Sequence, residues 1–191
     1  MEVKTLRNTS AIDASKLVSG ILNIVESVFV PEMRKVYMDR SFFLEQLMNQ
    51  ENINICCFNK DGELTGYLLA IPHNNKLEEL SAYDPCFEYN PENDTYYIEI
   101  IMSHSSRNHE TKRSFILMID EFIREAYERG KHYATMHALQ NEGLSHVIMK
   151  LYPVKILRTQ TFPELYGSDE IYDFLTADIH ECYQWIKEKR R

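Results

Sequence analysis

The clearest pattern in the chain is an apolar stretch that runs through a short polar turn into a long amphipathic segment. Residues 96–102 are mostly apolar, aromatic or β-branched, which predicts a buried strand. After the turn, apolar residues recur at helical spacing from Thr111 to Arg129, and Gly130 follows the last of them. Glycine is the common residue just past the end of a helix. We therefore expect a central strand that leads directly into a long helix.

Similar patterns predict the remaining elements. In chain order we expect a strand at 2–7, a helix that Asp13 or Ser15 caps, a helix at 41–50, strands at 53–58 and 64–71 around an Asp61-Gly62 turn, the central strand and helix, a strand at 131–139, a helix at 142–151, strands at 156–162 and 171–177, and a helix at 181–189. This order predicts an α/β fold with a mixed, largely antiparallel sheet flanked by helices, in a single domain over residues 1–191.

Residues 73–94 lose this periodicity and are strongly acidic, so we expect a long acidic loop there. Lys76 is its one lysine, set against six acids: Glu78, Glu79, Asp84, Glu88, Glu92 and Asp94. Two interpretations stay open for this loop. It is either a solvated surface segment or a lid that attracts a cationic substrate.

Charge and motifs narrow the class of protein. The chain has 21 basic and 29 acidic side chains and a net charge of −8, which disfavours non-specific binding to nucleic acid or to an anionic membrane. Neither an apolar signal core nor a membrane-spanning stretch is visible, so we expect a cytoplasmic protein. The sequence has no CxxC, HExxH, Walker or GxSxG motif, and we expect no metal cofactor.

The polar turn before the long helix is a candidate anion site. A helix N-terminus carries partial positive charge and attracts phosphate, and Lys112 and Arg113 add basic side chains there. The turn contains no glycine, although glycine normally lets a backbone fold closely around a pyrophosphate. An ordinary polar turn therefore stays open as the alternative.

The residues Tyr97, Ile98, Glu99, Ser103 and His104, followed by Arg107 and this turn, resemble the central motif of the GNAT superfamily of acyl-CoA-dependent N-acyltransferases. The resemblance covers most of the chain. It implies the GNAT fold, acetyl-CoA or another acyl-CoA as co-substrate, and an amine acceptor. Where that family has glycines, this chain has Asn108, Glu110 and Lys112, so the pyrophosphate-binding turn is divergent.

The same resemblance implies roles for individual residues. Glu99 would be the general base and Tyr152 the general acid, with His104 as an alternative base and helix packing as an alternative role for Tyr152. The implied cofactor-binding residues are Ile101, Met102, Ser103, Arg107, Asn108, His109, Lys112, Arg113, Ser114 and Asn141.

Two functions remain open at this stage. The first is an N-acyltransferase, most simply an acetyltransferase, that acts on a primary amine of a small molecule or a larger acceptor. The second is a non-catalytic GNAT-like module for CoA sensing or protein interaction, which the missing glycines favour. The strand at 171–177 would allow a homodimer if it lay at a sheet edge.

Overall fold

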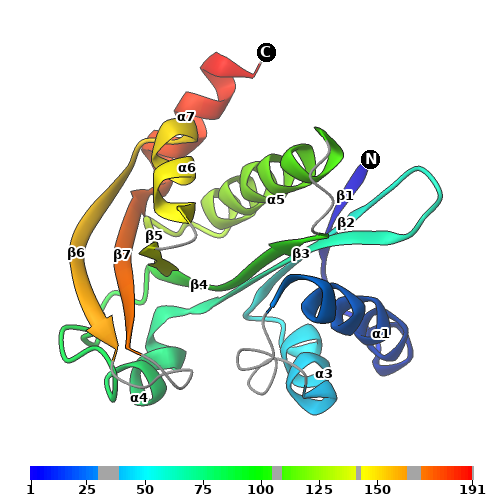
Figure 1. Ribbon diagram of the computed structural model, residues 1–191, viewed down its shortest axis with the longest axis horizontal. Helices are drawn as coiled ribbons and strands as arrows, with labels where there is room; N and C mark the ends of the chain where they lie inside the picture. The colour runs from blue at the N-terminus through cyan, green and yellow to red at the C-terminus, as the bar shows by residue number, and fades with distance from the viewer. Residues whose placement is uncertain (30–38, 105–108, 141–142, 163–168, 191) are drawn as a thin grey trace. The chain divides into compact units, whose positions relative to one another are not determined.

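The computed structural model describes residues 1–29, 39–104, 109–140, 143–162 and 169–190, without the side chains of 109–112 (Figure 1). Its elements follow the predicted order. They are β1 (Glu2–Leu6), α1 (Ala11–Val28), α3 (Arg40–Met48), β2 (Ile53–Phe58), β3 (Leu64–Pro72), the 3-10 helix η1 (His73–Lys76), α4 (Leu77–Leu80), β4 (Thr95–Ser103), α5 (His109–Glu128), β5 (Tyr133–Leu139), α6 (Leu144–Leu151), β6 (Val154–Phe162), β7 (Glu170–Asp178) and α7 (Ile179–Lys189).

The strands pair in the order β1-β2-β3-β4-β5-β7-β6, so the predicted mixed, largely antiparallel sheet flanked by helices is confirmed. The chain forms two compact units, which we describe separately. Unit 1 comprises Met1–Ala70 and Glu99–Glu125, and unit 2 comprises Ile71–Ile98 and Ala126–Arg191. The single GNAT-like acyltransferase domain expected over residues 1–191 stays a prediction.

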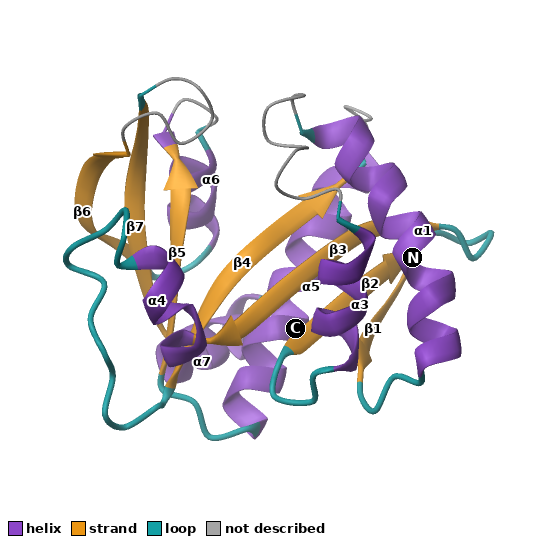
Figure 2. Cartoon of the chain, turned by 90° about the horizontal axis from the view of Figure 1, so that it is seen from below, coloured by secondary structure: helices purple, strands orange, loops and turns teal. Residues whose placement is uncertain are grey.

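In unit 1, β1, β2 and β3 form an antiparallel ladder. The β2–β3 connection is the predicted hairpin, in which Gly62 has a φ of +82°, a value that residues other than glycine rarely adopt. The helices α1 and α3 lie side by side (Figure 2). Arg40 joins them, because its guanidinium donates hydrogen bonds to the carbonyl and the hydroxyl oxygen of Ser15 at 3.0 and 2.9 Å.

The N-terminus of α1 differs from the expectation. Its cap is Ser10, whose hydroxyl oxygen accepts a hydrogen bond from the backbone N–H of Asp13 at 3.2 Å. Asp13 lies in the first turn, where a carboxylate stabilises the positive end of the helix, and Ser15 lies within the helix. The helix therefore begins at Ala11, earlier than predicted.

Gly66 of β3 lies where neighbouring elements approach closely. A β-carbon at this position would be 2.8 Å from Cε of Met118 on α5 and 3.3 Å from the carbonyl oxygen of Met102 on β4. Both distances are shorter than ordinary van der Waals contact. The absence of a side chain at Gly66 thus allows α5 to pack tightly against β3 in unit 1.

In unit 2, β4 pairs with β5 in parallel over Thr95–Tyr97 and Tyr133–Thr135, and β5 then pairs antiparallel with β7. The last strand in the order is β6, paired antiparallel with β7. The expectation that 171–177 could be a free edge is therefore wrong. This strand has a hydrogen-bonded neighbour on each side, because the chain returns from β6 to fill the position beside β5.

The acidic segment 73–94 contains more structure than predicted, namely η1 and α4. Leu80 and Phe87 from this segment form an apolar cluster with Tyr97 and Phe174. The ring of Phe87 meets those of Tyr97 and Phe174 edge to face, with centroids 5.6 and 6.1 Å apart.

Within the described residues, no helix combines the length and apolar character needed to cross a membrane.

Candidate functional site

The second half of β4 carries several of the predicted site residues. Ile100 and Met102 are buried, whereas Glu99, Ile101 and Ser103 are half-buried. Side chains alternate between the two faces of a strand, so the half-buried set shares one face. Glu99 is thus neither sealed in a core nor fully solvated, a position that suits a carboxylate meant to exchange a proton with a substrate.

His104 follows β4 and is held in unit 1 by two contacts. Its backbone N–H donates to the carbonyl of Thr65 at 3.0 Å, and its Nδ1 lies 3.1 Å from the hydroxyl oxygen of Ser27. Ser27 donates its own hydroxyl hydrogen to the carbonyl of Ile24 at 2.8 Å. His104 Nδ1 is therefore assigned as the donor in this pair.

The start of α5 is described in part. Arg107 and Asn108 lie outside the described residues, and His109 and Lys112 belong to the first turn, where only the backbone is described. Arg113 is exposed. Ser114 is only 1% exposed, and its hydroxyl contacts the sulfur of Met1 at 3.9 Å. Arg113 is thus the described side chain near this terminus that is accessible to an anion, whereas the Ser114 side chain faces the interior of unit 1.

Tyr152, the predicted general acid, is the C-cap of α6 in unit 2 and is 3% exposed. Its ring centroid lies 5.6 Å from that of Trp185 on α7, and the guanidinium of Arg190 lies 5.2 Å from it. These contacts fix the ring firmly and give it a packing role. Asn141 lies outside the described residues.

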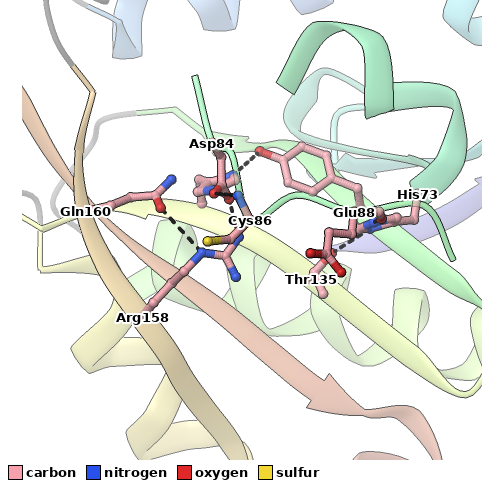
Figure 3. A network of polar contacts seen from close by, with 9 residues as sticks. His73, Asp84, Cys86, Glu88, Thr135, Arg158 and Gln160 are labelled. Atoms are coloured by element: carbon pink, nitrogen blue, oxygen red, sulfur yellow. Dashed lines mark hydrogen bonds and ion pairs between the residues drawn. The ribbon is translucent and has the colours of Figure 1, made fainter. Parts of the chain in front are cut away.

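A buried polar network in unit 2 was not expected from the sequence (Figure 3). Its centre is Asp84, which is 0% exposed and forms an ion pair with Arg158 of β6. Asp84 Oδ2 also lies 3.0 Å from Nε2 of His137 on β5. The other ring nitrogen of His137 lies 3.1 Å from the hydroxyl of Tyr97 on β4. The acidic segment is thereby tied to three strands of unit 2.

The electrostatics of this network assign its protons. Burial lowers the pKa of His137 to about 4, only partly opposed by the neighbouring Asp84 carboxylate, so the imidazole is neutral near pH 7. Burial by itself raises the pKa of Asp84, but hydrogen bonds from Arg158 and from the Cys86 backbone N–H lower it overall. Neutral His137 then donates from Nε2 to Asp84 and accepts the Tyr97 hydroxyl at Nδ1.

His73 makes a second set of contacts between this segment and β5. Its Nε2 lies 2.9 Å from the carbonyl of Glu88, and its Nδ1 lies 3.5 Å from the hydroxyl of Thr135 (Figure 3). The ring stacks on Phe87 with centroids 4.0 Å apart. Burial lowers the pKa of His73 below its ordinary value, and the bond to Glu88 opposes this. The segment is therefore clamped by two buried histidines.

Comparison with known proteins identifies the fold. No protein-family model matches the sequence, and no curated protein matches it. Solved structures do match. They include an aminoglycoside 6'-acetyltransferase type Ii, with 17% identity, a TM-score of 0.65, and coverage of 94% of this chain and 97% of the other.

Two further structures extend the comparison. An aminoglycoside 6'-N-acetyltransferase complexed with coenzyme A has 15% identity, a TM-score of 0.59, and coverage of 94% and 97%. A protein from Desulfovibrio desulfuricans assigned as an acetyltransferase of the GNAT family has 16% identity, a TM-score of 0.61, and coverage of 93% and 99%. Nearly the full length of this chain therefore has the GNAT acetyltransferase fold.

Proposed function

We propose that this protein is an N-acyltransferase that moves an acetyl group from acetyl-CoA to a primary amine of a small molecule or a larger acceptor. One observation carries the proposal. The strand–turn–helix unit of β4 and α5, which holds the GNAT-like residues, occurs within a fold that matches acetyltransferase structures over 94% of the chain. Because one fold can support many activities, the proposal also depends on the residues of β4 and α5 that match the GNAT motif.

The acyl-CoA would extend from β4 to the start of α5. The pantetheine would lie along Glu99–Ser103, where half-buried side chains alternate with buried ones. The pyrophosphate would lie at the N-terminus of α5, a helix of 20 residues whose backbone N–H groups favour an anion. Exposed Arg113 fits this role, because a guanidinium forms charge-assisted bonds to phosphate.

Ser114 would contribute differently from Arg113. Its side chain is buried, so only its backbone belongs to the proposed anion site. Ile101, Met102 and Ser103 would bind the pantetheine arm mainly through the strand backbone, which suits a chain of amide groups. Arg107, Asn108, His109, Lys112 and Asn141 complete the proposed set of cofactor-binding residues.

The chemistry would require one base and one acid. Glu99, directly or through a water, would take a proton from the acceptor ammonium, and the free amine would attack the thioester carbonyl carbon. The C–S bond of the resulting tetrahedral intermediate then breaks, and Tyr152 would donate its hydroxyl proton to the leaving thiolate. The second proton of the attacking nitrogen would pass through water to the Tyr152 oxygen, which gives a neutral amide and restores the hydroxyl. The packing of Tyr152 against Trp185 suits such a donor, because a fixed ring needs no reordering before proton transfer.

The decisive test is calorimetric titration of acetyl-CoA and of free CoA into the purified full chain. We expect micromolar binding that Arg113→Glu abolishes, since this change reverses the charge at the proposed pyrophosphate site. Arg124→Glu, the same substitution near the other end of α5, is the matched control and should bind normally.

The outcomes separate the two candidate functions. Binding together with transfer to an amine panel supports the enzyme. Binding without transfer to any amine supports the CoA-sensing module, which the glycine-free turn favours. No binding at millimolar CoA overturns both and leaves a protein-interaction role for the fold.

A further inference from the structure

Three side chains of metal-ligating type meet in unit 2 at the amino-terminal ends of β4 and β5. They are Glu92 and Asp94, before β4, and His132, before β5. One ligand atom from each lies within 4.8 Å of the other two. This cluster lies at the opposite end of β4 from Ser103, where the acyl-CoA is proposed to bind, so it takes no part in the function argued above.

Asp94 carries one carboxylate oxygen that no hydrogen bond satisfies among the described residues. The residue is only 9% exposed. Its Oδ1 accepts hydrogen bonds from the side chains of Asn90 and Thr95 at 2.8 and 3.1 Å. Its Oδ2 is buried and has no hydrogen-bond partner among the described residues. A buried carboxylate oxygen without a donor is costly, and a cation would remove that cost.

Asp94 Oδ2, the oxygen without a hydrogen bond, is directed at the cluster. Asp94 Oδ2 lies 3.1 Å from Nδ1 of His132, although the two atoms do not satisfy the geometry of a hydrogen bond. Two ligand atoms that each lie roughly 2.0 to 2.2 Å from one ion are about 3.0 to 3.5 Å apart, depending on the angle at the metal, so this pair can hold one ion with little change in separation. The His132 and Glu92 side chains are exposed, so an ion can enter from solvent.

The backbone holds the two inner ligands in place. The N–H groups of His132 and Tyr133 both donate to the carbonyl of Asp94, at 2.8 and 3.3 Å. Asn90 fixes the Asp94 carboxylate and also accepts the backbone N–H of Glu92 at 3.0 Å. Metal ligands in proteins are commonly oriented by such secondary hydrogen bonds. The Asp94 carboxylate is therefore already oriented, and the backbone that carries His132 is fixed beside it.

We propose that Glu92, Asp94 and His132 form a binding site for a divalent first-row transition-metal ion, with Zn²⁺ as the reference ion. One imidazole nitrogen and two carboxylate oxygens are a ligand set that Zn²⁺ accepts, and water would fill the fourth position. The ammonium group of Lys131, the residue before His132, donates a hydrogen bond to the carbonyl of Asn93 at 2.5 Å and lies over the ring of Tyr96. The ion would link the starts of β4 and β5, so its role is structural.

The proposal departs from the sequence-based expectation of no metal. No HExxH or CxxC pattern signals the site, because its ligands come from two segments that the long helix α5 separates. The metal site would also give Glu92 and Asp94 of the acidic segment a function other than attracting an amine substrate. Binding here is independent of acyl transfer, so the failure of either proposal leaves the other intact.

The test is titration of ZnCl₂ into the tag-free, chelator-treated full chain, followed by calorimetry, with Co²⁺ absorption as a second readout. We expect one ion per chain with micromolar or tighter affinity. The exposed residues are the ones to change, because Glu92→Gln and His132→Gln should leave the fold intact. Each should weaken Zn²⁺ binding at least tenfold and abolish the visible band of tetrahedral Co²⁺.

Matched controls are available in the same chain. Glu88→Gln alters another exposed acid of the acidic segment, and His146→Gln alters an exposed histidine on α6. Both should bind Zn²⁺ as the unaltered chain does. Saturating Zn²⁺ should also raise the unfolding temperature of the unaltered chain but not of His132→Gln. The proposal is overturned if no ion binds at millimolar Zn²⁺, or if binding survives both cluster substitutions.

Discussion

Nε2 of His137 lies 3.0 Å from Oδ2 of Asp84, inside unit 2, and this contact joins the acidic segment to β5. Asp84 is also the partner of Arg158, so one fully buried carboxylate serves two groups from different strands. A network of this kind is most sensitive at its shared member, because its loss leaves Arg158 without a counter-charge and His137 without a hydrogen-bond acceptor.

We predict that Asp84→Asn lowers the free energy of unfolding by about 3 to 5 kcal/mol, the range seen when one partner of a buried ion pair is removed. Urea denaturation would measure the loss. Glu78→Gln, a change at an exposed acid on α4, should leave stability unchanged. A loss below about 1 kcal/mol would mean that Asp84 is not the centre of the network.

Acid should destabilise the protein through His137. Its pKa is lowered from 6.5 to about 4 in the folded chain. As the pH falls, His137 therefore takes up its proton at a higher pH in the unfolded chain than in the folded chain. Stability is therefore lost between pH 6.5 and about 4, with roughly 2 kcal/mol lost between pH 7 and 5. Urea denaturation at pH 7 and pH 5 would measure this loss. The loss between the two pH values should be smaller in His137→Gln than in the unaltered chain, and the same in His146→Gln as in the unaltered chain. An equal difference in all three chains contradicts the assignment.

Gly66→Val should destabilise unit 1 by about 1 to 3 kcal/mol, because the new side chain overlaps the end of Met118 and approaches the Met102 carbonyl. Met118→Ala would remove the flexible obstacle. In a double-mutant cycle, the pair should therefore cost less than the sum of the two single changes. Additive losses of unfolding free energy would show that contact with Met118 is not what destabilises Gly66→Val.

Glu99→Gln should reduce kcat by about 100-fold or more if Glu99 is the general base, since the amide keeps the shape but cannot take a proton. Acetyl-CoA affinity and thermal unfolding should stay close to those of the unaltered chain. Steady-state kinetics with the best acceptor would measure the effect. An unchanged kcat would transfer the role to His104, which His104→Gln would then test.

Tyr152→Phe separates catalysis from packing, because phenylalanine keeps the ring against Trp185 and removes only the hydroxyl. We expect a fall in kcat of at least about tenfold with an unfolding temperature within a few degrees of the original. Tyr152→Ala, by contrast, should cost about 3 to 5 kcal/mol of stability. If the phenylalanine variant keeps full activity, Tyr152 serves packing alone.

The elements that the sequence predicted well are those with local signals. The hairpin at Gly62 and the helix end at Gly130 both need a positive φ value. Glycine adopts such values readily, so its presence in the sequence predicts both features. The cap of α1 was wrongly predicted at Asp13 or Ser15, because Ser10, Asp13 and Ser15 are all good capping residues and only the geometry identifies Ser10 as the cap.

The network around Asp84 could not be predicted, for a different reason. Its members come from the acidic segment, β4, β5 and β6, and no spacing in the sequence relates them. The place of β7 between β5 and β6 is equally non-local, since strand order is set by the return of the chain and not by the apolar pattern of one strand.

The position of β7 has a consequence for synthesis on the ribosome. β5 is made well before its antiparallel neighbour, because α6 and β6 intervene. Until Asp178 has left the exit tunnel, that side of β5 lacks its partner, and Phe174 is not yet present to complete the cluster with Phe87. From the synthesis of β5 until β7 becomes available, the nascent chain therefore carries an open strand edge and exposed aromatic surface, a state that chaperones recognise. Slow codons placed just before β7 should increase aggregation, whereas the same codons placed before β5 should not, because the open edge of β5 does not yet exist at that stage.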